Sequence, residues 1–520
     1  MEALDWLVIG VFFLALIGII VWVVRQKQND SADYFLGGRD ATWLAIGASI
    51  FASNIGSEHL IGLAGAGASS GMAMAHWEIQ GWMILILGWV FVPFYTRSMV
   101  YTMPEFLERR YNPQSRTILS VISLVSYVLT KVAVTVYAGG LVFQQVFGIK
   151  ELWGIDFFWI AAIGLVVLTA LYTIFGGMKS VLYTSVLQTP ILLLGSLIIL
   201  VLGFKELGGW DEMMRVCGAV TVNDYGDTMT NLIRSNDDAN FPWLGALIGS
   251  AIIGFWYWCT DQFIVQRVLS GKNEMEARRG TIFGAYLKLL PVFLFLIPGM
   301  IAFALHQKYI GAGGEGFLPM LENGTANADA AFPTLVAKLL PAGVKGLVVC
   351  GILAALMSSL ASLFNSSAML FTIDFYKRFR PQTSEKKLVG IGQVATVVIV
   401  ILGILWIPIM RSVGDVLYTY LQDVQSVLAP GIAAAFLLGI CWKRTSAQGG
   451  MWGLISGMVI GLTRLGAKVY YSNAGEVADS TFKYLFYDMN WLFFCGWMFL
   501  FCIIVVIVVL SLIHISEPTR

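Results

Sequence analysis

Three short stretches place polar groups inside otherwise apolar segments, where such groups are costly and therefore mark candidate functional sites. The first is residues 51–59, Phe-Ala-Ser-Asn-Ile-Gly-Ser-Glu-His. Gly56 allows the helix to open there, so that freed carbonyls could coordinate a small hard cation while Asn54 and His59 offer hydrogen bonds. The alternative is a helix that ends early in a loop. We favour an interrupted helix, because the apolar pattern resumes at Leu60.

The second stretch is residues 254–262, Gly-Phe-Trp-Tyr-Trp-Cys-Thr-Asp-Gln. Glycines at 249 and 254 weaken this helix, and aromatic rings suited to cover a ligand follow. An aromatic belt at the membrane interface is the alternative explanation. The third stretch contains Ser358 and Ser359 among small apolar residues. Their hydroxyl oxygens suit Na+, although serines also hold helices together.

Single polar residues in apolar surroundings add further candidates. Glu78 follows Trp77 directly, and it could instead be a solvated residue at a helix start. Lys131 and Lys288 could snorkel to the interface, but neither lies clearly at the end of a span, and we favour a functional role for Lys288. Gln422 lies among tyrosines, and carboxamides combined with aromatic rings are typical of sugar sites.

These groups require a membrane-embedded framework. Hydrophobic residues make up 58% of the 520 residues and charged residues 12%, about half the ~25% that is usual in soluble proteins. So few charges cannot cover the surface of a soluble chain of this length, so we predict an integral protein in a lipid bilayer. The net charge of +1 gives no reason to expect a nucleic-acid partner.

Apolar runs of membrane-spanning length predict about thirteen helices. They lie near residues 4–24, 41–64, 78–96, 117–147, 155–175, 181–204, 241–265, 280–305, 335–375, 389–410, 416–441, 447–467 and 490–512. Most of the basic residues fall in alternate loops, which places the N-terminus outside by the positive-inside rule. The interrupted spans 2 and 7 are five spans apart, as in transporters built from two inverted five-helix repeats.

Other functional classes have little support. We find no Walker A motif, no CxxC pair and no ligand-like arrangement of the four histidines. We therefore expect no enzymatic activity and no organic cofactor. A membrane sensor would need an attached kinase, for which the chain has no room. A channel is disfavoured, because a dehydrated site with gates on both sides gives slow turnover.

Five motifs resemble the sodium/solute symporter family, and specifically its sodium/glucose and sodium/galactose branch. They are Asn-Ile-Gly-Ser-Glu-His (54–59) with Gly-Leu-Ala-Gly (62–65), Tyr-Thr-Met-Pro-Glu-Phe (101–106), Leu-Tyr-Thr-Ile-Phe-Gly-Gly (171–177), Trp-Tyr-Trp-Cys-Thr-Asp-Gln (256–262) with Val-Gln-Arg (265–267), and Met-Ser-Ser-Leu-Ala-Ser (357–362) with Phe-Asn-Ser (364–366). The likeness covers roughly residues 34–465 in order.

The resemblance implies an all-α, polytopic membrane protein with a LeuT-like five-plus-five inverted repeat and 13–14 transmembrane helices. Residues 1–520 would form one transporter domain. It would comprise an extra N-terminal helix at 4–24, repeats at 41–204 and 241–441, and additional helices at 447–512. We expect residues 513–520 to be a non-native tail and a fourteenth helix to be missing. The implied function is symport of sodium and a monosaccharide across the plasma membrane, with a monomer sufficient. Inositol and sialic acid are alternative substrates.

The resemblance also implies site residues. Sodium would be bound by the backbone carbonyls of Ala52, Ile55 and Ala355 and the hydroxyls of Ser358 and Ser359. The sugar would contact Asn54, His59, Glu78, Tyr127, Tyr257, Trp258, Lys288 and Gln422. The gates would be Leu63, Trp77, Tyr257 and Tyr418.

Two positions depart from the family pattern. Ser185 stands where many members have an acidic residue, which favours one sodium per sugar. Gly254 replaces a polar side chain expected to touch the sugar, so one hydroxyl contact would be lost. His59 resembles the glucose-type members.

Overall fold

The computed structural model describes residues 1–26, 28, 30–56, 58–321, 324–413, 417–473 and 478–516, without the side chains of 129, 409–413, 417–423, 473 and 511–516. The described chain is predominantly helical. Its first half contains α1 (Ala3–Val24), α2 (Ser31–Leu36), α3 (Trp43–Asn54), α4 (Ala64–Ser69), α5 (Ala75–Ile79), α6 (Trp82–Ile86), α7 (Val92–Ser98), α8 (Met103–Arg110), α9 (Pro113–Ser126), α10 (Ala133–Phe147), α11 (Phe157–Leu207) and α12 (Trp210–Gly218).

The second half continues in the same way. It contains α13 (Trp243–Gly254), α14 (Gln262–Leu269), α15 (Glu274–Leu287), α16 (Ile297–Gly311), α17 (Ala331–Leu339), α18 (Val344–Met369), α19 (Lys377–Phe379), α20 (Glu385–Val413), α21 (Leu417–Cys441), α22 (Ala447–Asn473), α23 (Thr481–Lys483) and α24 (Trp491–Ser516). A short hairpin pairs β1 (Glu151–Leu152) with β2 (Ile155–Asp156), with Glu151 opposite Asp156.

Short 3₁₀ and π-helical segments join many of these helices. They are η1 (Gly37–Arg39), η2 (Glu58–Leu63), η3 (Gly71–Met74), η4 (Leu87–Phe91), η5 (Tyr127–Val132), η6 (Phe255–Thr260), η7 (Val292–Leu296), η8 (Ala328–Ala330), η9 (Leu370–Tyr376) and η10 (Tyr484–Asp488). Segments of this kind often mark functional sites inside longer helices, and η2 and η6 lie in the two stretches that the sequence singled out.

Each predicted span corresponds to helical structure. In the described part of the chain, ten helices are long and apolar enough to cross a membrane. The backbone leaves helical geometry at Gly177, so α11 supplies two spans. The interrupted run through α3 and α4 and the helix α22 account for the remaining two. The long 335–375 run covers most of α17, all of α18 and most of η9.

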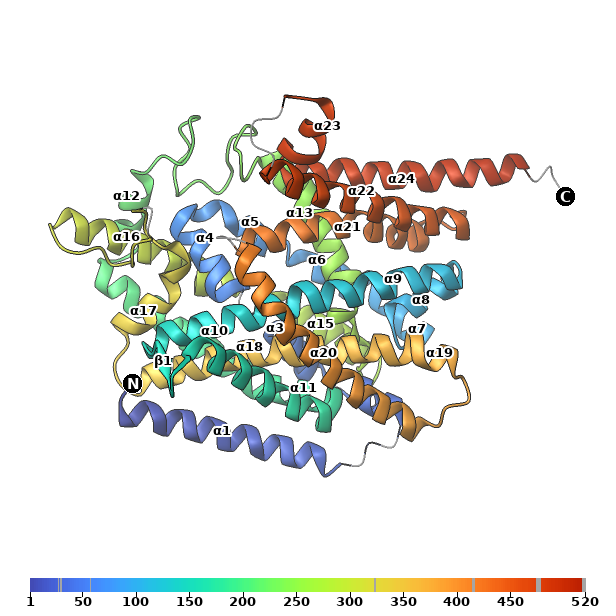
Figure 1. Ribbon diagram of the computed structural model, residues 1–520, viewed down its shortest axis with the longest axis horizontal. Coiled ribbons are helices and arrows are strands. Elements are labelled where there is room, and N and C mark those ends of the chain that lie inside the picture. The colour runs from blue at the N-terminus through green and yellow to red at the C-terminus, as the bar shows by residue number, and fades with distance from the viewer. Residues whose placement is uncertain are drawn as a thin grey trace.

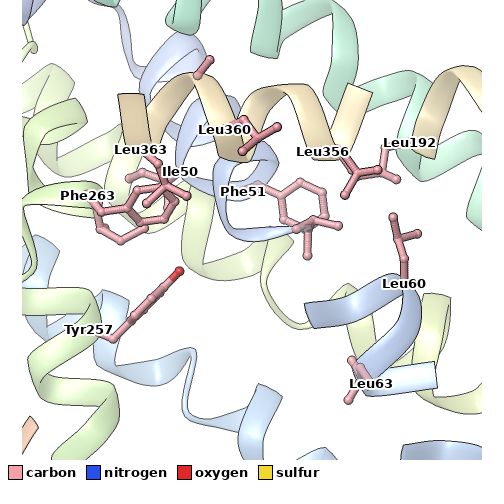
Figure 2. Packing of buried hydrophobic residues seen from close by; sticks show 14 of the residues in the cluster. Ile50, Phe51, Leu60, Leu63, Leu192, Tyr257, Phe263, Leu356, Leu360 and Leu363 are labelled. Atoms are coloured by element: carbon pink, nitrogen blue, oxygen red, sulfur yellow. The ribbon is translucent and has the colours of Figure 1, made fainter. Parts of the chain in front are cut away.

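The helices form a bundle with α1 and α24 along opposite edges (Figure 1). In its interior, α18 packs along α11 and against α3. Figure 2 shows Leu356, Leu360 and Leu363 along α18, together with Phe51 of α3 from the same buried cluster. The α7, α8 and α19 helices lie at one end of the bundle, and β1, α12 and the N-terminus lie at the other (Figure 1).

Candidate functional site

The two interrupted helices stop where their backbones become extended. α3 ends at Asn54, and Ile55 has φ −77° and ψ 107°. The carbonyls of the last turn of α3 therefore lose their helical partners. η6 ends at Thr260, and Asp261 follows with φ −74° and ψ 127°. The Asp261 side chain accepts a hydrogen bond from the backbone N–H of Phe263, so it caps α14 and starts a new helix.

Three charged or ionisable side chains from different helices meet beside the first break. The Lys288 ammonium lies 2.6 Å from one carboxylate oxygen of Glu78. The other carboxylate oxygen lies 3.3 Å from Nε2 of His59, which is 2.8 Å from Nζ of Lys288. All three residues are buried. A buried carboxylate needs such a partner, because a lone charge at this depth is strongly unfavourable.

An aromatic residue faces this group from the second break. The Asn54 amide donates a hydrogen bond of 3.0 Å to the Tyr257 hydroxyl, which joins α3 to η6. The Tyr257 ring packs edge-on against Trp258, with centroids 4.9 Å apart. The two interrupted helices are thus bonded to each other next to the Glu78 carboxylate.

These side chains line one narrow cavity. Six of the eight predicted sugar-contacting residues lie on its wall, namely Asn54, His59, Glu78, Tyr257, Trp258 and Lys288. The predicted gate residue Trp77 also lines it, and its ring lies 5.6 Å from that of Trp491. The predicted side chains of Gln422 and Tyr418 lie outside the described residues.

Two predicted residues lie elsewhere. Leu63 is buried in the main hydrophobic cluster on the segment after the first break (Figure 2) and is not part of the cavity wall. The Tyr127 hydroxyl donates a hydrogen bond to Asp261, and the backbone N–H of Phe263 donates to the same hydroxyl at 3.0 Å. Tyr127 therefore stabilises the second break through its contacts with Asp261 and Phe263.

Lys131 completes this supporting cluster. Its ammonium lies 2.7 Å from Asp261 and 4.6 Å from the centroid of the Tyr257 ring. Both partners of the ion pair are buried. Lys131 is therefore a paired interior residue, and snorkelling to the interface does not describe its position.

Two glutamines on the cavity wall were not predicted. Gln425 lies three residues after Gln422, so the two positions share one face of α21. Gln80 approaches Gly254 so closely that a β-carbon at 254 would collide with its carboxamide oxygen. The absence of a side chain at position 254 leaves space for a neighbour. Only the structure shows that Gln80 fills this space.

The predicted cation site brings oxygen atoms together between α3 and α18. The Ser359 hydroxyl donates to the Ser53 carbonyl at 2.8 Å and lies 3.3 Å from the Ile55 carbonyl oxygen. Ala52 and Ala355 are buried within one helical turn of these residues. A set of neutral hydroxyl and carbonyl oxygens fits a hard cation such as Na+. The sequence did not identify Ser53 as a cation-site candidate, because only the folded structure brings its carbonyl next to the Ser359 hydroxyl.

Ser358 points to a neighbouring serine. Its hydroxyl lies 3.3 Å from that of Ser185 on α11, and Ser185 also donates to the Val181 carbonyl at 2.6 Å. The position where many family members have an acidic residue therefore adjoins the predicted cation site, and in this chain it supplies a neutral hydroxyl.

A model of the "Sodium:solute symporter family" matches residues 34–457, which is most of the chain. The chain belongs to this family. Human "Sodium/myo-inositol cotransporter 2" is 38% identical over 479 residues, which cover 89% of this chain and 70% of that protein. Rat "Sodium/glucose cotransporter 2" is 38% identical over 522 residues, which cover 96% of this chain and 76% of that protein.

Solved structures of symporters confirm the LeuT-like fold. A Na+-coupled sialic acid symporter superposes with a TM-score of 0.78 at 22% identity, over 98% of both chains. MhsT, solved with L-phenylalanine, gives 0.55 at 12% identity over 93% of this chain and 99% of its own. This symporter is thus a multi-pass membrane protein that couples solute transport to Na+, and its relatives are transporters rather than enzymes.

Proposed function

We propose that this symporter imports a monosaccharide of the glucose or galactose type together with sodium across the plasma membrane, with its N-terminus outside and one protomer sufficient. The observation that carries the substrate class is a set of buried polar atoms on the cavity wall. Asn54 Oδ1, His59 Nδ1 and Gln80 Oε1 have no hydrogen-bond partner among the described residues. Buried polar atoms need partners, and the hydroxyls of a sugar can both donate and accept.

The other wall features support the same substrate. Aromatic residues cover the apolar C–H faces of a pyranose ring, and Tyr257, Trp258 and Trp77 line the cavity. The Glu78 carboxylate provides a strong acceptor for hydroxyl protons. Its charge is balanced by Lys288, and a second carboxylate on the wall, Glu58, disfavours an anionic solute.

A cyclitol is the second candidate. Myo-inositol is also a six-membered ring of hydroxyl groups, and the "Sodium/myo-inositol cotransporter 2" proteins of human, mouse and cattle are 38–39% identical to this chain. Among the described residues of the cavity wall, the one lysine or arginine is Lys288, which pairs with Glu78 and so is not free to anchor an anion. Sialic acid, which carries a carboxylate, is therefore the least suitable of the three substrates.

The proposed cation site at the first break suggests how sodium would be coupled to the solute. The Ser359 hydroxyl on α18 donates a hydrogen bond to the Ser53 carbonyl at the end of α3. The adjacent residue, Asn54, donates a hydrogen bond to the Tyr257 hydroxyl on the cavity wall. A change in coordination at Ser359 therefore reaches the solute cavity through one short backbone segment. Coupling requires that sodium bind the two transport states with different affinities.

The energy available from one sodium ion is substantial. A membrane potential of ~100 mV contributes ~2.3 kcal/mol per charge, which corresponds to roughly fiftyfold accumulation of solute. The neutral Ser185 beside Ser358 supports one sodium per solute rather than two.

Uptake into proteoliposomes tests the proposal. Labelled glucose, galactose, myo-inositol and sialic acid are compared with and without an inward sodium gradient. We expect sodium-dependent uptake of a hexose, with competition by unlabelled hexose. Preferential uptake of myo-inositol would favour the second candidate, and uptake indifferent to sodium would overturn the coupling.

A further inference from the structure

A second pocket, separate from the solute cavity, lies at the end of the bundle where α7 and α8 are found. It has a volume of about 350 Å³, and its wall includes Arg39, Arg97, Met99, Lys272 and Glu274. Three chain segments contribute: η1 before α3, the end of α7, and the loop between α14 and α15. In Figure 1 this end of α7 lies far from β1 and the N-terminus.

The charges of the pocket are unbalanced. Arg97 shares the one carboxylate of the wall, Glu274, at 3.7 Å, and Arg278 lies at the same distance from it. Within the described part of the chain, Arg39 and Lys272 form no ion pair with an acidic side chain. Burial is the main cause that lowers the pKa of the Arg39 guanidinium, so this positive charge would be stabilised by an anion.

Backbone geometry and hydrogen bonds fix the position of Arg39 in the pocket wall. Arg39 and Met99 both have positive φ angles, 52° and 51°, which are unfavourable for residues other than glycine. Arg39 donates hydrogen bonds to the backbone carbonyls of Met99 and Val100 at 3.1 and 2.9 Å. Such strained residues cluster at functional sites, because the surrounding contacts must compensate their cost.

Backbone contacts hold the other side of the pocket. Ala41 N–H donates to the Ser270 carbonyl at 3.0 Å, and Lys272 N–H donates to the Ala41 carbonyl at 3.1 Å. The segment that leads into α3 is therefore fastened to the loop that follows α14. The pocket therefore lies between the start of α3 and the end of α14.

Apolar side chains beside the pocket place it at the membrane surface. Trp43, two residues after Ala41, is 40% exposed, and Met99 and Phe94 are 56% and 49% exposed. Exposed tryptophans are enriched at the level of lipid headgroups. Free phosphate requires no such apolar border, whereas the acyl chains of a lipid do.

We propose that this pocket binds the phosphate headgroup of an anionic phospholipid. Arginine and lysine are the preferred phosphate partners in proteins, and basic pockets between transmembrane helices bind such headgroups. Arg39, Arg97 and Lys272 come from three different segments of the wall. A bound lipid ties the start of α3 to the start of α15, and it thereby influences the movement of the interrupted helices.

The full-length protein in phosphatidylcholine nanodiscs, with and without phosphatidylglycerol, provides the test. Retention of phosphatidylglycerol is measured by mass spectrometry for the wild type, for R97Q/K272Q, and for K386Q/K387Q, which removes two exposed charges at another loop. We expect several-fold lower retention only in R97Q/K272Q. Equal retention in all three proteins, or an equal loss in both variants, would overturn the proposal.

Further measurements distinguish bound lipid from free phosphate and test the role of the charges. Millimolar inorganic phosphate should not displace the lipid, and displacement would assign the site to free phosphate instead. Glu274→Gln removes the pocket's carboxylate and should raise retention, which keeps the proposal testable if R97Q/K272Q fails to fold. The variant R97K/K272R should retain lipid as the wild type does. A loss there would show that the positive charges are not what binds.

Discussion

The carboxamide of Gln80 occupies the space that a side chain at position 254 would need. The glycine suggests one lost sugar contact when the sequence is read alone. The structure instead places the carboxamide of Gln80 at this point, with its oxygen unpaired on the cavity wall. The polar group thus comes from Gln80, which follows α5, whereas the departure from the family pattern lies in α13.

Replacing Gly254 by alanine should displace the Gln80 carboxamide and raise the solute concentration needed for half-maximal uptake by about tenfold. One lost hydrogen bond to a buried polar group costs about 1–3 kcal/mol. Gln80→Ala should have a similar effect, and the double variant should be little worse than either single one. Gly164→Ala, where a β-carbon meets open space, is the control. Unchanged uptake by G254A would contradict this role of Gln80.

Neutralising Glu78 alone should destabilise the protein, because it leaves the buried Lys288 ammonium without a carboxylate. Removing one member of a buried ion pair costs about 3–5 kcal/mol. The double variant Glu78→Gln/Lys288→Met should recover much of that loss in thermal unfolding but should still fail in uptake. Glu212→Gln breaks the exposed pair with Arg215 and should change stability little. If the double variant is as unstable as E78Q, the two residues do not act as a pair.

Ser359→Ala should raise the sodium concentration needed for half-maximal uptake steeply, by tenfold or more, since it removes the hydroxyl that meets the carbonyls of Ser53 and Ile55. Ser367→Ala is a matched control, because the Ser367 hydroxyl is buried without a partner among the described residues. Its sodium dependence should stay near that of the wild type. The cation site would have to be placed elsewhere if both variants respond alike.

Asp261→Asn should weaken the ion pair with Lys131, whose ammonium lies over the Tyr257 ring. It should thereby speed sodium-independent efflux of preloaded solute. Asparagine still caps α14, so the change isolates the charge that pairs with Lys131. The stranded ammonium should lower stability by about 3–5 kcal/mol. Lys131→Met/Asp261→Asn should restore part of this stability. Efflux at the wild-type rate in D261N would show that the ion pair does not hold Tyr257 in place.

The sequence alone determined where the membrane spans lie and where polar groups enter them. Lipid cannot satisfy backbone or side-chain polar groups, so the break near Gly56 and the buried Glu78 and Lys288 stand out against their apolar surroundings. The second break lies at Asp261, whereas the sequence pointed to Gly249 and Gly254, and the backbone is still helical at Gly254. The same reasoning identified Ser359 and the aromatic run that contains Tyr257.

Only the tertiary structure decided which of these groups meet. Glu78, His59 and Lys288 come from three different helices, and no local pattern encodes their pairing. Tyr127 supports Asp261 instead of lining the cavity, and Leu63 packs into the core. Hydropathy reports the depth of a residue in the membrane, whereas the neighbours of each side chain depend on how helices far apart in the sequence cross and rotate against one another.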